Sequence, residues 1–393
     1  MFDREECTYR AVGSCTCLDC SKEPVVVIAP EDNSDSICYQ HNVTLRNVRE
    51  FIDGGMLGSI CNDESLLLYS QTENSRTQIG VCAGISIQDC LNGTVKCHEM
   101  TIQHQDTTRR KNLMPKGVDP IMVMYRQNTT IDDIVSSIMN SDKPVIDMIK
   151  TDGSNPSTIS THKLWIVKKK EDIASITEAF EEVQSLYIAD GHHRTADACR
   201  KASLNKSNPN KHSMYIMAML FPHTQLSLVS FNRYIRSIDI PISTLLERVS
   251  KSFNIIEEKE YGMENSDSDA QSMRMYANGT WFVLEKLDSI EINDDDPISS
   301  IDSQILCDHL LRPALGVVSP SLDPRIGYIS GSGSTSMTKL SELVDSGVAT
   351  IAFAMTSISV DDIMTIADSG KLLPPKASCF DPKPLKGLMV RLH

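Results

Sequence analysis

The sequence predicts a mixed α/β fold, because short apolar runs alternate with amphipathic helical segments along the whole chain. Two further observations support this class. Hydrophobic residues make up 40% of the 393 residues and charged residues 23%, as in ordinary globular proteins. Turn-forming Gly, Asn, Asp and Pro separate the runs at short intervals. A chain of this length has room for two or three domains.

Strands are expected where apolar or alternating residues run between turn signals. Their expected ranges are 24–28, 66–69, 78–87, 120–126, 144–150, 161–167, 187–190, 214–221, 226–231 and 349–355. The Asn92-Gly93 pair predicts a hairpin turn before a further strand at 94–99.

Helices are expected where apolar residues recur on one face and polar residues can cap the ends. Their expected ranges are 43–52, 130–139, 173–183, 195–204, 299–311 and 359–370. Thr130 with Asp133, and Ser359 with Asp362, have the form of a capping box.

Composition excludes several classes of protein. The net charge of −14 argues against a broad surface for nucleic acid, and any anion would need a local basic pocket. No apolar run approaches the roughly 20 residues of a membrane helix, and Met1 to Glu6 show no signal-peptide core. We therefore expect a cytoplasmic protein with no membrane or nucleic-acid partner. Its oligomeric state stays open between monomer and homodimer.

The twelve cysteines are expected to be reduced thiols in that compartment. Cys7, Cys15, Cys17 and Cys20 are close enough in the sequence to bind a metal ion. They lack, however, the paired C-x-x-C knuckles of a structural zinc site. Free thiols are the favoured interpretation of this cluster, and a metal site is the alternative.

The most informative segment is the run Tyr187-Ile-Ala-Asp-Gly-His-His-Arg-Thr-Ala196, which predicts a strand, a glycine turn and a helix start. A helix N-terminus offers unpaired N–H groups and the positive end of a dipole, so it favours an anion. His192, His193 and Arg194 add positive charge, which indicates phosphate. Asp190 is placed to bind a metal ion or to accept a proton. A polar surface turn is the alternative.

A glutamate beside a histidine ends the expected strand at 94–99. Glu99 is a candidate general base, since proton abstraction needs one carboxylate near the reacting hydroxyl. Downstream, the basic run 109–111 could hold phosphoryl oxygens. Together with the turn at 190–194, these residues supply the base, the cations and the anion site that phosphoryl transfer requires. Taken alone, Glu99 would be an ordinary solvated side chain.

Three further segments have both a structural and a functional interpretation. The glycine-serine loop at 330–335 is either a phosphate-binding loop or a flexible surface loop, and it is not a Walker A motif. The proline-rich tail either presents Lys376 and Ser378 to a pocket or straps the core, with the strap slightly favoured. Asn232-Arg233 indicates an ion pair by default, or a clamp for a substrate carboxylate.

At these residues the chain resembles the free serine kinase family. The segment Ile188-Ala-Asp-Gly-His-His-Arg194 is similar to the family signature, and further matches follow in order along the chain. These are at 96–99, 231–233, 311–316, 366–370 and 373–378. The resemblance implies a ParB/sulfiredoxin-like catalytic core at 78–240, with an N-terminal α/β segment at 1–77 and a C-terminal α/β domain at 241–393.

The resemblance implies transfer of phosphate to the hydroxyl of free L-serine, giving O-phospho-L-serine, with Mg²⁺ as cofactor. The branch that this chain resembles includes pyrophosphate users, so pyrophosphate is the expected donor and ADP or ATP the alternative. Glu99 would be the base, with Asp190 and His193 also catalytic and Asp190 binding the metal. The donor would be bound by His98, Arg109, Gly191, His192, Arg194, Thr195, Lys376 and Ser378, and the substrate by Asn232 and Arg233.

Two departures from the family pattern concern the donor and the substrate. Ile102 stands where relatives often have arginine, and the segment 108–112 lacks the Asp-Arg-x-x-His of relatives apart from Arg109. A ParB-like nucleotide- or DNA-binding module is one alternative, against which the net charge counts. A sulfiredoxin-like thiol enzyme using Cys199 is another, although Cys199 is expected to pack inside its helix.

Overall fold

The computed structural model describes residues 25–27, 58–59, 65–101, 119–151, 159–204, 214–258, 272–320, 322–374, 376–386 and 388–391. The chain divides into two compact units. The first unit comprises Met1–Cys97, Thr101–Leu226 and Pro382–His393, and the second comprises His98–Met100 and Ser227–Asp381. Both units contain helices and sheets, so the predicted mixed α/β class is confirmed. The expected division into three segments stays a prediction.

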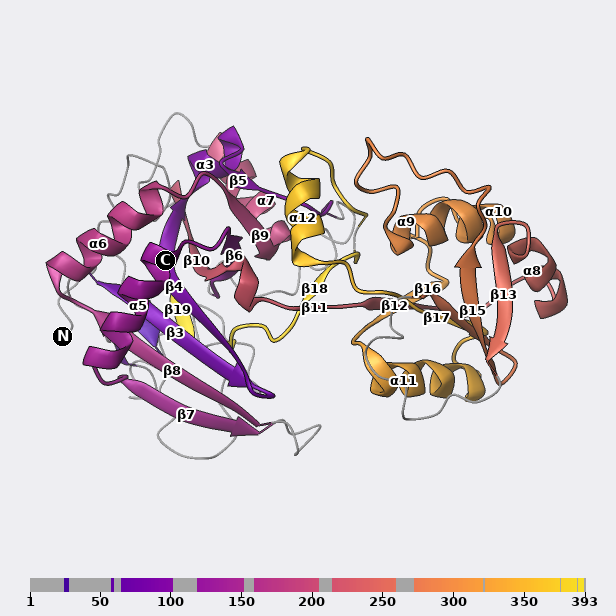
Figure 1. The fold of residues 1–393 in the computed structure, drawn as a ribbon, viewed down its shortest axis with the longest axis horizontal. Coiled ribbons are helices and arrows are strands. Elements are labelled where there is room, and N and C mark those ends of the chain that lie inside the picture. The colour runs from indigo at the N-terminus through magenta and orange to yellow at the C-terminus, as the bar shows by residue number, and fades with distance from the viewer. Residues whose placement is uncertain are drawn as a thin grey trace. The chain divides into compact units, whose positions relative to one another are not determined.

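An eight-stranded mixed sheet forms the first unit, in the order β5-β9-β6-β10-β4-β3-β8-β7 (Figure 1). Its strands are β3 (Leu66–Glu73), β4 (Arg76–Ser86), β5 (Val95–Lys96), β6 (Ile121–Tyr125), β7 (Ile146–Thr151), β8 (Ile159–Val167), β9 (Leu186–Asp190) and β10 (Tyr215–Pro222). The pairs β5–β9 and β6–β10 are parallel, and the other neighbours are antiparallel. A separate small sheet joins β1 (Val25–Val27), β2 (Gly58–Ser59) and β19 (Met389–Arg391).

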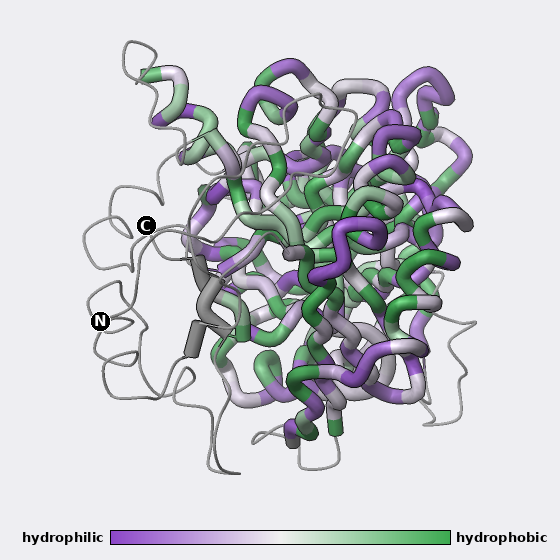
Figure 2. The backbone as a smooth tube through the Cα atoms, turned by 90° about the vertical axis from the view of Figure 1, so that its left-hand side faces the viewer, coloured by the Kyte–Doolittle hydropathy of each residue, from purple (hydrophilic) through white to green (hydrophobic). Residues whose placement is uncertain are grey.

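The described part of the first unit contains four α-helices. They are α3 (Ile87–Asn92), α5 (Thr129–Ser141), α6 (Lys170–Glu181) and α7 (His192–Leu204), with a 3-10 turn, η2 (His223–Gln225). Ile131 of α5 and Phe180 of α6 join one core with Val123 of β6. Figure 2 shows the hydrophobic residues concentrated along the inner segments of the tube. Burial of one helix stripe and one sheet face therefore supplies the core.

The second unit is built on a six-stranded antiparallel sheet in the order β13-β15-β14-β17-β12-β16. Its strands are β12 (Phe231–Ile235), β13 (Phe253–Glu258), β14 (Arg274–Ala277), β15 (Thr280–Lys286), β16 (Ile326–Ser330) and β17 (Ile351–Ala354). A two-stranded ribbon pairs β11 (Leu228–Val229) with β18 (Cys379–Phe380).

Helices cover both faces of the second sheet (Figure 1). They are α8 (Ile242–Val249), α9 (Asp302–Leu306), the π-helical turn η4 (Cys307–Leu311), α10 (Arg312–Leu315) and α11 (Gly333–Asp345). Helix α12 (Val360–Asp368) also belongs to this unit. Leu245 of α8 and Leu306 of α9 belong to the core on one face. Met337 and Leu340 of α11 pack with Trp281 on the other. None of the helices that the structure describes has the length and apolar character of a membrane span.

Two local expectations are wrong. Asn92 ends helix α3 and Gly93 caps it in the left-handed conformation, so no hairpin forms there, and β5 pairs with β9 instead. The N-cap of α5 is Asn128, whose side chain accepts hydrogen bonds from the N–H groups of Thr130 and Ile131. The capping box expected at α12 is confirmed. The helix expected at 43–52 lies outside the described residues.

Candidate functional site

A single glycine makes the turn between β9 and α7. Gly191 has a φ of 107°, and a Cβ placed on it would lie 2.6 Å from Cγ2 of Ile121 in β6. Both the backbone conformation and the space therefore require glycine. Helix α7 begins at His192 rather than at 195 as expected, so His192, His193 and Arg194 all lie in its first turn.

Asp190 forms ion pairs with two cations of the first unit. Arg194 Nη2 lies 3.2 Å from its Oδ2, and Lys383 Nζ bonds to its Oδ1. Burial opposes ionisation of this carboxyl, but Lys383 and Arg194 outweigh burial and hold the pKa of Asp190 below its usual range. Asp190 is therefore a permanent anion at neutral pH.

Lys383 is a candidate residue that sequence reasoning missed. It is 193 residues from Asp190 in the chain, and its signal in the sequence is its position between Pro382 and Pro384. Those prolines restrict the backbone of the tail that carries the ammonium group. The tail thereby supplies a cation to the turn that begins α7.

Arg194 is oriented by the start of β6 as well as by Asp190. Its Nη1 donates to the carbonyl oxygens of Asp119 and Pro120, at 2.7 and 2.8 Å. Three of its hydrogen bonds are thus internal to the first unit. The guanidinium is consequently held in one orientation at the start of α7.

The two histidines of the turn differ in burial. His192 is 9% exposed, and burial lowers its pKa to about 4 even though Asp190 acts in the opposite direction. At neutral pH its imidazole is uncharged, so it can exchange hydrogen bonds but adds no positive charge. His193 is exposed. Thr195 is buried and its hydroxyl donates to the Gly191 carbonyl, 3.2 Å away.

Asp190 is not part of a cluster of metal-binding side chains within the described residues. Across the described part of the chain, no three His, Cys, Asp or Glu side chains gather in a way that could hold a metal ion. Both carboxylate oxygens of Asp190 already have a cationic partner. The expected metal role of Asp190 stays a prediction.

In the second unit, Glu99 is held by a loop that is distant in the sequence. Met100 N–H donates to the Leu373 carbonyl at 3.0 Å, and Leu373 N–H donates to the His98 carbonyl at 2.7 Å. These two bonds align residues 98–100 beside Leu373, with Glu99 in a parallel bridge to it. The chain then turns at Lys376 and returns to Glu99.

Hydrogen bonds to Glu99 come from that loop. Ser378 Oγ donates to Oε2 of Glu99 at 3.1 Å, and the N–H groups of Lys376 and Ser378 also donate to the carboxylate. Nε2 of His98, whose side chain is fully buried, lies 2.8 Å from Ser378 Oγ. Because a hydroxyl carries one proton, its donation to Glu99 requires Nε2 of His98 to be the donor in the second bond. The result is a chain from His98 through Ser378 to Glu99.

Glu99 has a high affinity for a proton. Burial raises the pKa of its carboxyl, and although the donors on Ser378 and Lys376 act against this, the pKa stays above its usual range. A raised carboxyl pKa suits a general base working near neutral pH.

Lys376 adopts a left-handed backbone conformation, with a φ of 66°. Non-glycine residues rarely occupy this region, at a cost of roughly 1–2 kcal/mol. Its Nζ lies 5.0 Å from the centroid of the Phe231 ring. The conformation aims the N–H of Lys376 at Glu99, so the surrounding contacts hold a strained backbone at the base.

Asn232 and Arg233 have different roles in the second sheet. Asn232 Nδ2 donates to the Gly331 carbonyl, and its Oδ1 accepts from Met355 N–H, both at 2.9 Å. Arg233 is 4% exposed, and its described partners are the Phe231 carbonyl, at 3.0 Å, and the ring and hydroxyl of Tyr328. Among the described residues Arg233 forms no ion pair with a carboxylate. Burial lowers its pKa, yet a guanidinium remains charged.

A family model described as "Protein of unknown function (DUF1015)" matches residues 24–304, well over half of the chain. The chain belongs to this family. A comparison with curated protein sequences finds no match.

Solved structures similar to this DUF1015 chain include "Free serine kinase in complex with AMP", at 13% identity and a TM-score of 0.36, covering 76% of this chain and 86% of that one. A "Conserved hypothetical protein from Pyrococcus furiosus" has 11% identity and a TM-score of 0.35, with 76% and 90% covered. "SbnI with C-terminal truncation from Staphylococcus aureus" has 9% identity and a TM-score of 0.38, with 79% and 87% covered.

The predicted site residues of the DUF1015 chain fall into two groups. Asp190 to Thr195 lie in the first unit with Lys383, whereas His98, Glu99, Arg233 and the loop 376–378 lie in the second. Arg109 and the cluster Cys7, Cys15, Cys17 and Cys20 lie outside the described residues. The glycine-serine loop joins β16 to α11, and its Ser332 Oγ accepts from Ser230 N–H at 3.2 Å.

Proposed function

We propose that this protein is a kinase for a small molecule, transferring a phosphoryl group to the hydroxyl of free L-serine to give O-phospho-L-serine. The observation that carries the proposal is Glu99, a half-buried carboxylate with a raised pKa and with ordered hydrogen-bond donors from the loop 376–378. The sequence motifs that resemble the free serine kinase family assign the base to the same residue. Both lines of argument support an enzyme that removes a proton from an alcohol.

In the proposed step, the hydroxyl oxygen of L-serine attacks the terminal phosphorus of the donor. The hydroxyl proton passes to Glu99 as the new O–P bond forms and the P–O bond to the leaving group breaks. With pyrophosphate as donor, the leaving group is inorganic phosphate. The chain from His98 through Ser378 orients the carboxylate.

Pyrophosphate is the proposed donor, with ADP or ATP as the alternative. The family branch supports this choice, and the low aromatic content of 5% is compatible with a donor that has no base to stack. The first turn of α7 is proposed to bind donor phosphate through its N–H groups and through the cations Arg194 and Lys383. Mg²⁺ is proposed to enter with the donor, since it binds substrate phosphates with only one or two carboxylates.

The test is an assay of phosphoserine by phosphorus NMR. The full chain is incubated with L-serine and Mg²⁺ and, in separate reactions, with pyrophosphate, ADP or ATP. The proposal expects phosphoserine to accumulate with pyrophosphate faster than with either nucleotide. Phosphoserine formed only with ADP or ATP would refute pyrophosphate as the donor but support the proposed kinase activity. No phosphoserine with any of the three would refute the proposed function.

A further inference from the structure

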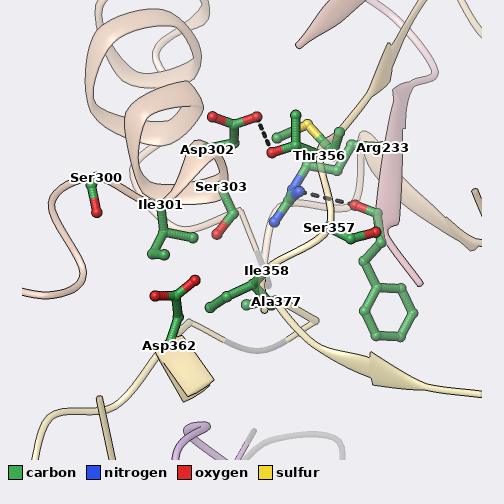
Figure 3. A pocket seen from close by; sticks show the side chains of 12 residues that line it. Arg233, Ser300, Ile301, Asp302, Ser303, Thr356, Ser357, Ile358, Asp362 and Ala377 are labelled. Atoms are coloured by element: carbon green, nitrogen blue, oxygen red, sulfur yellow. Dashed lines mark hydrogen bonds between the residues drawn. The ribbon is translucent and has the colours of Figure 1, made fainter. Parts of the chain in front are cut away.

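A cavity of about 210 Å³ opens in the second unit, enclosed by four segments (Figure 3). They are the start of β12, the start of α9, the segment from β17 to α12, and Ala377 in the Glu99 loop. The cavity is smaller than the roughly 300–1,000 Å³ of sites for drug-sized molecules. Its size indicates a ligand of few atoms.

The inner wall of this cavity is cationic and contains an unused hydroxyl. Arg233 lines it, and no carboxylate among the described residues pairs with its guanidinium. Ser303 also lines it and is 7% exposed, and its buried Oγ has no hydrogen-bond partner among the described residues. Unsatisfied buried hydroxyls are uncommon and costly, so such a group calls for a ligand. In Figure 3 the Ser303 hydroxyl and the Arg233 guanidinium point into the same space.

Carboxylates occupy other parts of the cavity wall. Asp302 lines it and accepts a hydrogen bond from the Thr356 hydroxyl. Asp362 lines it from the first turn of α12, where it is exposed and one of its oxygens accepts from Ser359. The cavity wall therefore carries a buried cation, Arg233, on whose charge Asp302 also acts, and a second carboxylate at Asp362. That pattern complements a zwitterion, with its carboxylate at Arg233 and its ammonium at the aspartates.

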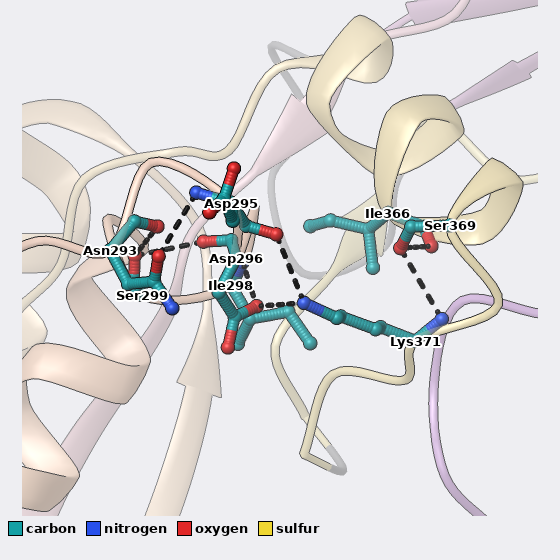
Figure 4. A network of polar contacts seen from close by, with 8 residues as sticks. All are labelled: Asn293, Asp295, Asp296, Ile298, Ser299, Ile366, Ser369 and Lys371. Atoms are coloured by element: carbon teal, nitrogen blue, oxygen red, sulfur yellow. Dashed lines mark hydrogen bonds and ion pairs between the residues drawn. The ribbon is translucent and has the colours of Figure 1, made fainter.

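The cavity wall is held in place by a polar network (Figure 4). Lys371, just after α12, bonds to the Asp296 carboxylate at 3.1 Å and to the Asp295 carbonyl at 3.3 Å. Ser299 Oγ donates to the carbonyls of Asn293 and Asp296. This network joins the segment before α9 to the end of α12, and both of these helices begin in the cavity wall. A pre-ordered wall lowers the entropic cost of binding a small ligand.

We infer that this cavity is a binding site for the zwitterionic head of a free α-amino acid, with the carboxylate bound by Arg233 and Ser303. Ala377 lies in its wall, and the residues on either side of Ala377, Lys376 and Ser378, donate to Glu99. An amino acid bound here would be the acceptor of the proposed kinase. The inference rests on the proposed function for the identity of that amino acid, L-serine, but binding can be measured without turnover.

The experiment is equilibrium dialysis of the full chain with radiolabelled L-serine and no phosphate donor. Ser303→Ala is the decisive variant, because it removes a hydroxyl that makes no hydrogen bond within the described structure. We expect its thermal unfolding midpoint to stay the same or rise, while L-serine binds roughly tenfold more weakly. If Ser303 had only a structural role, its replacement would not weaken L-serine binding while leaving the thermal unfolding midpoint unchanged. Ser341→Ala on α11, whose hydroxyl donates to the Thr338 carbonyl, is the matched control and should change neither.

Two further comparisons test the charge pattern. Arg233→Met keeps a long apolar stem and should weaken L-serine binding at least about 100-fold. Asp362→Asn keeps the ability to cap α12 and should weaken binding several-fold, about threefold to tenfold. Ethanolamine, which lacks the carboxylate, and hydroxypropionate, which lacks the ammonium group, should not compete with L-serine for the wild-type chain.

Failure of this inference differs from failure of the proposed function. Absence of L-serine binding, or equal binding by wild type, Ser303→Ala and Arg233→Met, would overturn the site even if phosphoserine is formed. If L-serine binding depends on Ser303 and Arg233 but no donor gives phosphoserine, the binding site is supported and the proposed kinase activity is refuted. Competition by ethanolamine as strong as that of L-serine itself would also overturn it.

Discussion

The turn at Asp190 in the first unit and the loop at Glu99 in the second each hold one carboxylate, but they shift the pKa of that carboxylate in opposite directions. Asp190 has Arg194 and Lys383 as partners, and its pKa lies below the usual range. Glu99 has a hydroxyl and backbone N–H groups as partners, and burial holds its pKa above the usual range. Neighbouring cations decide the first case and burial decides the second.

The difference separates the chemical roles of the two residues. Carboxyl groups whose environments push their pKa values apart are assigned different tasks in a reaction. Asp190 has little affinity for a proton at neutral pH and serves to organise the cations beside it. Burial gives Glu99 a higher affinity for a proton than an ordinary glutamate has, as the proposed base requires.

The largest expected effect is on turnover. Glu99→Gln keeps an acceptor for the Ser378 hydroxyl but cannot take a proton, so phosphoserine formation should fall about 100- to 10,000-fold. Initial rates with saturating L-serine and pyrophosphate measure this. Glu342→Gln, on the exposed face of α11, makes the same chemical change in the same unit and should keep the wild-type rate. A Glu99→Gln enzyme with full activity would remove the base from the account.

The second-largest expected effect is a loss of stability when the glycine of the turn beside Asp190 is replaced. Gly191→Ala adds a Cβ 2.6 Å from Ile121 at a positive φ, and should lower the free energy of unfolding by about 3 kcal/mol. Gly93→Ala, also at positive φ but with no atom within 4 Å, should cost only about 1 kcal/mol. Urea denaturation gives both values. Equal losses would show that packing against Ile121 contributes nothing.

The pH dependence of stability should have opposite signs at the two carboxylates. The lowered pKa of Asp190 adds stability above its unfolded pKa of about 3.9, and this is lost as the pH falls through the folded value. The raised pKa of Glu99 adds stability below its unfolded pKa of about 4.3, and this is lost as the pH rises through the folded value.

Two variants measure that contrast by urea denaturation at several pH values. Asp190→Asn should cost about 1 kcal/mol at neutral pH, because the side chain is partly exposed, and less in acid. Relative to wild type, Glu99→Gln should become more stable as the pH rises from about 4. Asp147→Asn, in an exposed ion pair with Lys163, is the control and should have little effect. If the stability difference from wild type changes with pH in the same direction for both variants, the opposite pKa shifts assigned to Asp190 and Glu99 are contradicted.

The smallest effect concerns the strained residue of the Glu99 loop. Lys376→Gly and Lys376→Ala remove the same ammonium group, but only glycine adopts a φ of 66° without strain. The glycine variant should therefore be the more stable of the two by about 1 kcal/mol, as measured by thermal unfolding. Equal thermal stability of the Lys376→Ala and Lys376→Gly variants would show that the backbone at residue 376 is not strained.

Local patterns in the sequence predicted the strands of the eight-stranded sheet, but only β17 of the six-stranded sheet, and they did not predict which strands pair. The apolar run at 187–190 and the capping pair Ser359 and Asp362 appear as expected, because their signals are local. The hairpin predicted at Asn92-Gly93 was wrong, because glycine at positive φ occurs both in hairpin turns and at helix C-caps.

The site shows the same limit. Glu99 and Ser378 were both singled out, yet their hydrogen bond spans 279 residues and comes from the fold. The ion pair between Lys383 and Asp190 and the cavity lined by Ser303 both depend on segments far apart in the chain, so no local pattern predicts either of them.

The most direct test of the central claim is a carboxyl-carbon NMR titration of the chain with labelled glutamate. The signal that disappears in Glu99→Gln identifies Glu99, and we expect it to titrate above the usual glutamate value of about 4.3. A titration of that signal at or below about 4.3 would contradict the account, because Glu99 would then lack the proton affinity assigned to the base.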